Sequence, residues 1–129
     1  MSRKSKGINA ERDLIHKFWG SDGWAAIRIA GSGSMKYPSA DVLATNKLRK
    51  LAIECKTSND HNKYLTKDEI DQLKRFSTMF GAEPWIAVKF DRHEWLFMSI
   101  DDLNDSGNNF LVSLDIAEKK GLSFSELLK

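Results

Sequence analysis

The residues best suited to chemistry lie between Asp41 and Lys56, in two β-rich segments separated by the polar sequence Asn-Lys-Leu-Arg. Two such segments around a short polar turn predict an antiparallel hairpin. If Lys47 and Leu48 form the two-residue loop, the numbers of any two paired residues add up to 95, as 47 and 48 do. Because 41 and 54 also add up to 95, Asp41 lies opposite Glu54. Directly opposed residues have Cβ atoms ~4.5–5.5 Å apart on one side of a sheet, so the two carboxylates converge. Lys56 shares that side, because side chains alternate along a strand.

Two carboxylates this close repel each other unless a cation lies between them or one of them takes a proton. Mg²⁺ takes an octahedron of oxygen ligands and usually keeps several waters, so Asp41, Glu54 and the backbone carbonyl of Cys55 would suffice as protein ligands. Lys56 could then stabilise a developing negative charge or orient a water molecule made acidic by the metal. A Glu-x-Lys triplet alone more often forms a cross-strand salt bridge on a solvated face. The interpretation therefore depends on the register and on residues upstream.

These residues also resemble a known family. Asp41, Glu54 and Lys56, with Pro38 shortly before the aspartate, are similar to the D…ExK signature of the restriction-endonuclease-like nucleases. Within that superfamily the chain resembles the archaeal Holliday junction resolvases, through Lys6-Gly7, Ala10-Glu11-Arg12, Arg28 followed by Ala30-Gly31-Ser32, and the spacing to Asp41 and Glu54. Residues 4–90 carry the resemblance well and the rest more loosely. Ala40 stands where many relatives have proline.

The resemblance implies an α/β fold with a restriction-endonuclease-like core, a central mixed β-sheet flanked by helices. It implies Mg²⁺ as the cofactor, with Mn²⁺ as a substitute and no small-molecule cofactor. Glu11 would assist in metal binding, and Ser32 matches the family's motif serine. The expected catalytic residues are Glu11, Ser32, Asp41, Glu54 and Lys56, and the expected metal ligands are Glu11, Asp41, Glu54 and the carbonyl of Cys55.

The N-terminal segment is basic. We expect residues 1–7 to form a mobile arm, followed by a helix from about Ile8 to Trp19 that ends at Gly20. Glu11 lies on the apolar face of that helix, and a carboxylate on a buried stripe needs a partner. That partner is either the Asp41/Glu54 site or an arginine, Arg12 or Arg28, and the resemblance favours the first.

Several groups could contact DNA phosphates. In the strand predicted over 24–30, Arg28 faces away from Ile27 and Ile29. Residues 31–40 are rich in Gly and Ser and predict a flexible loop beside the site. For Ser34, a role in a turn is as plausible as a phosphate contact. The expected DNA-binding residues are Arg3, Lys4, Lys6, Arg12, Arg28, Ser32 and Ser34.

Later segments predict the rest of the domain. Residues 57–64 predict a polar loop, and we assign His61 no role there. Thr66 to Glu69 is a capping box that opens a helix ending at Gly81, on which Phe76 and Phe80 line a face suited to the core or to a subunit contact. Strands are expected over 84–90, which should be central, over 94–100 and over 110–113. Residues 115–121 are ambiguous between loop and helix, and Ser123 to Glu126 is a second capping box.

Composition indicates one nuclease domain over residues 1–129, with 41% hydrophobic and 29% charged residues. The sequence has no apolar run long enough to cross a bilayer and no signal-peptide pattern, so we expect an intracellular, cytoplasmic protein associated with the nucleoid. Cys55, the single cysteine, is expected to be a small core residue. Residues 1–60 hold 11 Lys/Arg against 6 Asp/Glu, whereas 61–129 hold 9 against 12. The predicted site therefore lies in the basic half, which would attract a polyanion.

We therefore predict a magnesium-dependent, structure-selective endonuclease of DNA recombination and repair. It would act as a homodimer on branched DNA and resolve four-way junctions by paired symmetric nicks. The alternatives are another nuclease of the same superfamily, specific for a sequence or a flap, and a non-catalytic DNA-binding module.

Overall fold

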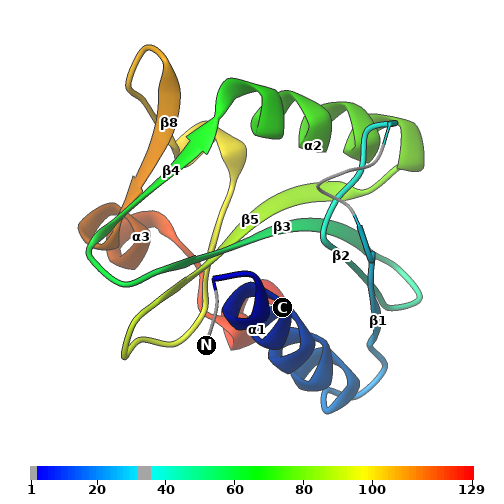
Figure 1. Ribbon diagram of the computed structural model, residues 1–129. Coiled ribbons are helices and arrows are strands. Elements are labelled where there is room, and N and C mark those ends of the chain that lie inside the picture. The colour runs from blue at the N-terminus through cyan, green and yellow to red at the C-terminus, as the bar shows by residue number, and fades with distance from the viewer. Residues whose placement is uncertain (1–2, 32–35) are drawn as a thin grey trace.

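Strands β3 (Lys50–Ser58) and β5 (Glu83–Phe90) run parallel through the middle of a five-stranded mixed sheet (Figure 1). The structure, a computed structural model, describes residues 3–31 and 36–129, so the predictions for Ser32 and Ser34 lie outside the described residues. The strand order is β1-β2-β3-β5-β6, where β1 is Ala25–Arg28, β2 is Val42–Thr45 and β6 is Leu96–Met98. Apart from the β3–β5 pair, all pairs in this sheet are antiparallel. The predicted central position of β5 is confirmed.

A smaller antiparallel sheet has the order β4-β8-β7. Its strands are β4 (Asn62–Thr66), β7 (Asn104–Asp105) and β8 (Asn109–Ser113). The helices are α1 (Arg3–Trp19), α2 (Lys67–Phe80), α3 (Leu114–Lys120) and α4 (Phe124–Leu127), with a 3₁₀ turn, η2, over Ile100–Asp102.

Helices α1 and α2 cover opposite faces of the large sheet (Figure 1). On the α1 side, Leu14 and Phe18 are fully buried against Ile53. On the α2 side, Ile70 and Leu73 pack in a second core that includes Ala52. Each fully buried large apolar side chain stabilises the fold by roughly 1.5–3 kcal/mol, so these contacts hold both helices on the sheet. Because side chains alternate along β3, Glu54 and Lys56 point to the α2 side.

The β2–β3 register is the one that the sequence predicts. Val42 pairs with Ile53 and Thr45 pairs with Lys50, so the paired positions sum to 95 in both cases. The turn between the strands spans Asn46 to Arg49, and the Asn46 side-chain oxygen accepts from the N–H groups of Leu48 (2.8 Å) and Arg49 (2.6 Å). The hairpin prediction is therefore confirmed.

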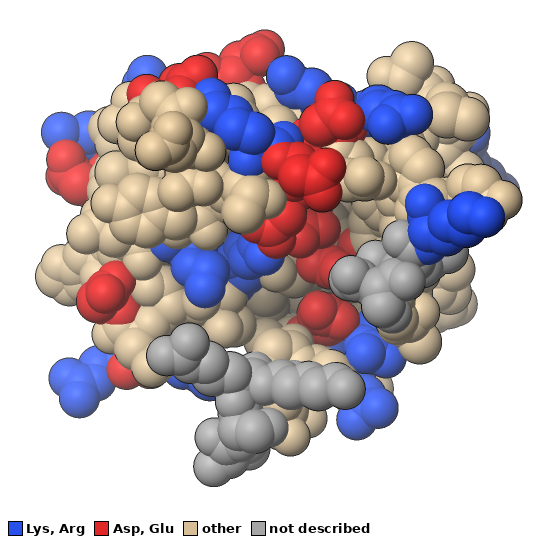
Figure 2. Space-filling view, turned by 45° about the horizontal axis from the view of Figure 1, so that its top comes forward, with Lys and Arg blue, Asp and Glu red and all other residues tan. Residues whose placement is uncertain are grey.

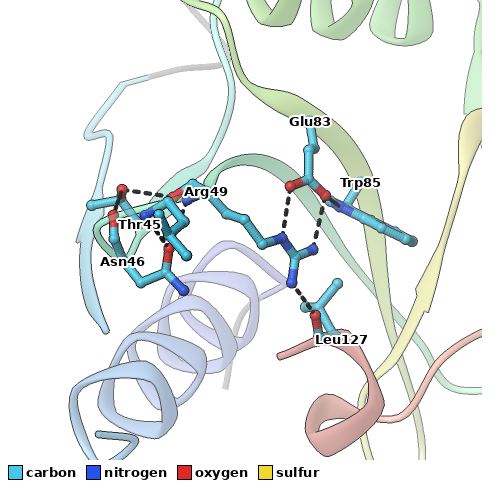
Figure 3. A network of polar contacts seen from close by, with 7 residues as sticks. Thr45, Asn46, Arg49, Glu83, Trp85 and Leu127 are labelled. Carbon is cyan, nitrogen blue, oxygen red and sulfur yellow. Dashed lines mark hydrogen bonds and ion pairs between the residues drawn. The ribbon is translucent and has the colours of Figure 1, made fainter. Parts of the chain in front are cut away.

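Arg49 ties this turn to the rest of the fold (Figure 3). Its guanidinium donates two hydrogen bonds of 2.8 Å to the carboxylate of Glu83, at the start of β5, and one of 2.7 Å to the carbonyl of Leu127 in α4. The indole of Trp85 donates to the same carboxylate at 3.1 Å. A bidentate arginine–carboxylate pair has a defined geometry, so the turn is fixed against β5 and α4.

Two local predictions need correction, and the structure resolves one segment that the sequence left ambiguous. Helix α1 begins at Arg3 and not at about Ile8, because Arg and Lys are good helix formers and one interior glycine costs only about 1 kcal/mol. Residues 57–64 are mostly strand: β3 continues to Ser58 and β4 begins at Asn62. A short turn joins them, in which the Ser58 hydroxyl donates to the carbonyl of Asn62 at 2.7 Å. Residues 115–121 are largely helical, because the Ser113 side chain caps α3 by accepting from the N–H of Ile116.

Both capping boxes are confirmed. Thr66 and Glu69 close the first at the start of α2, and Ser123 and Glu126 close the second at the start of α4. Helix α2 ends at Gly81, which has the left-handed φ of 74° that glycine adopts without strain.

Candidate active site

Asp41 is held rigidly beside the middle of β3. Its N–H donates to the carbonyl of Ile53 at 3.0 Å, and its carbonyl accepts from Ile29 at 2.8 Å. Its carboxylate oxygen Oδ2 accepts a hydrogen bond of 2.9 Å from the N–H of Cys55. The aspartate therefore bridges β1 and β3, with its carboxylate next to Glu54.

Glu54 and Lys56 lie on the same side of β3, as predicted. Their side chains are only 15% and 20% exposed, and Lys56 Nζ lies 3.6 Å from Glu54 Oε2. The pKa of Glu54 is raised to about 8, mainly by burial and secondly by the negative charge of Asp41, while the ammonium of Lys56 acts in the opposite direction. The two carboxyl groups therefore do not both ionise readily at neutral pH without a cation between them.

The ammonium of Lys56 is also paired with Glu69, from the first turn of α2. Burial alone would lower the pKa of Lys56, but the hydrogen bond to Glu69 and the charges of Glu54 and Glu69 outweigh it and raise the pKa. Lys56 is therefore a fixed cation at neutral pH. The sequence indicated Glu69 only as a helix cap, and its contact with Lys56 was not predicted.

Glu11 has an arginine partner in the structure. Arg28 Nε donates to Glu11 Oε1 at 2.9 Å, which is the arginine pairing that the sequence offered as the alternative, with Arg28 and not Arg12 as the partner. Burial and the charge of Asp41 both raise the pKa of Glu11, while Arg28 and Lys56 lower it, so the carboxylate of Glu11 also feels the charge of Asp41. Arg28 points to the α1 side, away from Ile29, which packs on the α2 side. Its guanidinium is engaged by Glu11, so a direct phosphate contact by Arg28 remains a prediction.

The donor set fits a hard divalent ion. Asp41 and Glu54 offer carboxylate oxygens, and burial of the pair creates a charge conflict that a cation relieves. Among residues 3–31 and 36–129, no group of three or more His, Cys, Asp or Glu side chains is arranged to hold a metal. An ion that keeps several of its own waters needs no third side chain, so metal binding by Glu11 and by the carbonyl of Cys55 stays a prediction.

Cys55 points to the α1 side of β3, where it packs against the core as predicted. Burial raises the pKa of its thiol well above the ordinary value, so the thiol is a poor nucleophile.

A polar groove of about 510 Å³ adjoins the site, between the first half of α1 and the β3–β4 connection. Its lining includes Lys6, Lys56, Asn59, Lys63 and Tyr64, and Lys6 donates to the side chain of Asn59. Arg12 is exposed on α1. Figure 2 shows acidic side chains gathered in the middle of one face, with basic side chains on both sides of them.

Comparison with known proteins identifies the family. The sequence model of the archaeal Holliday junction resolvases matches residues 2–129. The chain belongs to this family. Crossover junction endodeoxyribonuclease Hjc of Archaeoglobus fulgidus is 41% identical over 130 residues, covering 95% of each chain. The corresponding enzyme of Methanocaldococcus jannaschii is 36% identical over 107 residues, covering 83% of this chain and 75% of that one.

The fold agrees with a solved member of the resolvase family. The structure of Archaeoglobus fulgidus Hjc, described as a Holliday junction resolvase, superposes with a TM-score of 0.87 and 38% identity, covering 93% of this chain and 96% of that one. The predicted family and the α/β fold class are confirmed. Within the described part of the chain, no helix is long and apolar enough to span a membrane.

Proposed function

We propose that this chain is a metal-dependent endonuclease that resolves four-way DNA junctions by paired, symmetric nicks. The observation that carries the proposal is the meeting of Asp41, Glu54 and Lys56 on one face of β3, with the Asp41 carboxylate fixed by the N–H of Cys55. Family membership supports it, since the named relatives are crossover junction endodeoxyribonucleases. Nucleases of this family generally depend on a metal ion.

Asp41 and Glu54 would hold the ion, Mg²⁺ with Mn²⁺ as a substitute, which supplies a Lewis acid beside the scissile phosphate. Hydrolysis adds water across one P–O bond and leaves a phosphate monoester and a hydroxyl. Lys56 carries a fixed positive charge where negative charge grows on the phosphate oxygens in the transition state. Asp41 is held by three backbone hydrogen bonds, so the site is preorganised before substrate binds.

The DNA contacts belong to the same proposal. Lys6 borders the groove beside Lys56, and Arg12 is exposed on the same helix, so both suit phosphate contacts. Such contacts position the backbone without reading sequence, which suits an enzyme selective for branched shape. The full proposed set is Arg3, Lys4, Lys6, Arg12, Arg28, Ser32 and Ser34.

A homodimer completes the proposal, because a four-way junction has two equivalent strands to cut and a two-fold pair supplies two equivalent sites. An apolar groove of about 320 Å³ between β1, β2 and the end of α2, lined by Ile27, Leu43 and Phe80 among others, suits a second copy of the chain. Ile27 is 59% exposed and Phe80 47% exposed, and Phe76 stacks on Phe80 with ring centroids 5.2 Å apart.

The test compares a synthetic four-way junction with duplex and flap substrates of the same sequence, with Mg²⁺ and with chelator. We expect the junction alone to be cut rapidly, at paired positions near the branch point. Asp41→Asn should reduce cleavage by more than about a hundredfold, since it removes a ligand and not merely an outer-shell partner. Junction binding should persist or tighten, because the change removes a negative charge near phosphate.

Asp115→Asn, at an exposed position of α3, is the matched control and should cut like the parent. Equal cleavage of junction and random duplex, or cutting that follows a base sequence wherever the branch lies, would refute the junction-resolving function. Loss of binding in parallel with cleavage would give Asp41 a structural role.

A further inference from the structure

The carboxylate of Glu69 joins the N-terminus of α2 to Lys56. One oxygen, Oε1, accepts from the N–H of Thr66 at 2.9 Å, and the Thr66 hydroxyl accepts from the N–H of Glu69 at 3.0 Å, which closes the capping box. The other oxygen, Oε2, is hydrogen-bonded to Lys56 Nζ. A single side chain therefore completes a helix cap and holds a lysine on the neighbouring strand.

Lys56 needs such a partner. A lysine side chain is a flexible stem that carries a point charge, so its position has to be imposed from outside. The carboxylate of Glu54 also pairs with this ammonium, but it lies 3.6 Å away, beyond hydrogen-bonding distance. Glu69 is therefore the carboxylate that fixes the ammonium, while Glu54 remains available to a cation.

Glu69 itself rests on a rigid support. Ile70, the next residue, is buried in the α2-side core together with Leu73, and the cap fixes the backbone at Thr66. The capping box alone would not require the lysine contact, since it uses only Oε1. Helix α4 provides the comparison: Glu126 closes an identical box, on a helix that packs against the α1 side of the sheet, away from Lys56.

We propose that Glu69 is a positioning residue for Lys56 and holds its ammonium beside Glu54, at the place where the scissile phosphate would develop charge. The inference rests on the proposed function for the role of Lys56, but the positioning itself is a property of the free protein. Cleavage rate and Lys56 order should therefore both depend on the charge of Glu69.

The experiment uses Glu69→Gln in the full chain. Glutamine at this position also closes a capping box, so the helix start survives while the charge that binds Lys56 is removed. Glu126→Gln makes the same change in the other capping box and is the matched control. Thr66→Ala removes the capping hydroxyl and leaves the Glu69–Lys56 pair in place. It therefore distinguishes the effect of a weakened helix cap from the effect of a lost ion pair.

Two readouts are taken. The first is NMR of protein labelled with ¹⁵N-lysine, with chelator present to remove metal ions. The side-chain ammonium resonance of Lys56 is assigned by its absence in Lys56→Arg, and its observation shows that the ammonium is held in one position. With Mg²⁺ and junction, single-turnover cleavage at saturating protein is measured beside the junction dissociation constant. For Glu69→Gln we expect loss of the ammonium signal and a cleavage rate lowered about 10–100-fold, with junction affinity equal or tighter.

Glu126→Gln should retain both the signal and the rate. Thr66→Ala should lower the unfolding midpoint and keep the Lys56 signal. A Lys56 signal that survives in Glu69→Gln, or that is lost equally in Thr66→Ala, would overturn the positioning role. A wild-type protein that shows the signal but does not cut the junction would refute the proposed function and leave the positioning of Lys56 intact.

Discussion

The buried carboxylate pair should make the metal-free protein less stable as pH rises. The pKa of Glu54 is raised to about 8 from an ordinary value of 4.5, by burial first and by Asp41 second. Between those two pH values the folded protein keeps a proton that the unfolded chain has released. The unfolded state therefore binds fewer protons, and the free energy of unfolding falls with increasing pH across this window.

The magnitude follows from the same two values. At 1.36 kcal/mol per pH unit, the difference between 4.5 and about 8 lowers the free energy of unfolding by on the order of 5 kcal/mol above pH 8. At neutral pH this destabilisation is roughly 3 kcal/mol, and below the ordinary pKa of glutamate it vanishes. Glu54→Gln replaces the carboxyl with a neutral group of the same shape and should remove this cost.

The assay is urea unfolding in chelator from about pH 5 to about pH 8, for the parent, Glu54→Gln and the exposed α3 control Glu118→Gln. We expect Glu54→Gln to be more stable than the parent, with a gap that widens by up to about 1.4 kcal/mol per pH unit. Mg²⁺ should then stabilise the parent at the upper end of the range and leave Glu54→Gln nearly unchanged. A gap that does not change with pH would refute the assignment of the raised pKa to Glu54.

Two further predictions concern the support of the site and its assembly. Arg49→Ala should lower the free energy of unfolding by about 1–3 kcal/mol, because the carboxylate of Glu83 loses both of its guanidinium hydrogen bonds. Arg49→Lys should not restore this stability, since lysine lacks the planar guanidinium that donates both bonds at once. Urea unfolding measures both variants. Phe80→Glu should convert the proposed dimer to a monomer in sedimentation, whereas Met79→Glu, at an 82% exposed neighbouring position, should not; a monomeric parent at micromolar concentration would contradict the dimer.

Features that depend on interactions between residues close in the sequence could be predicted from the sequence alone. The Asn46–Arg49 turn sets the pairing of β2 with β3, and that pairing places Asp41 beside Glu54. Both capping boxes involve residues only three positions apart, so they form wherever the helix lies. The start of α1 at Arg3 is not evident from the sequence, because a contact with a distant turn, Lys6 with Asn59, cannot be seen from neighbouring residues.

Only the tertiary structure decided how the charges of the site are partnered. Between Arg12 and Arg28 as the partner of Glu11, the packing of α1 against β1 selected Arg28. Glu69 contacts Lys56 because α2 packs, through the buried side chains of Ile70 and Leu73, on the face of the sheet to which Lys56 points. The raised pKa of Glu54 likewise depends on burial by residues from several elements. Spacing along the chain determines which side of a strand a residue occupies, whereas contacts and desolvation between elements depend on how their apolar faces pack.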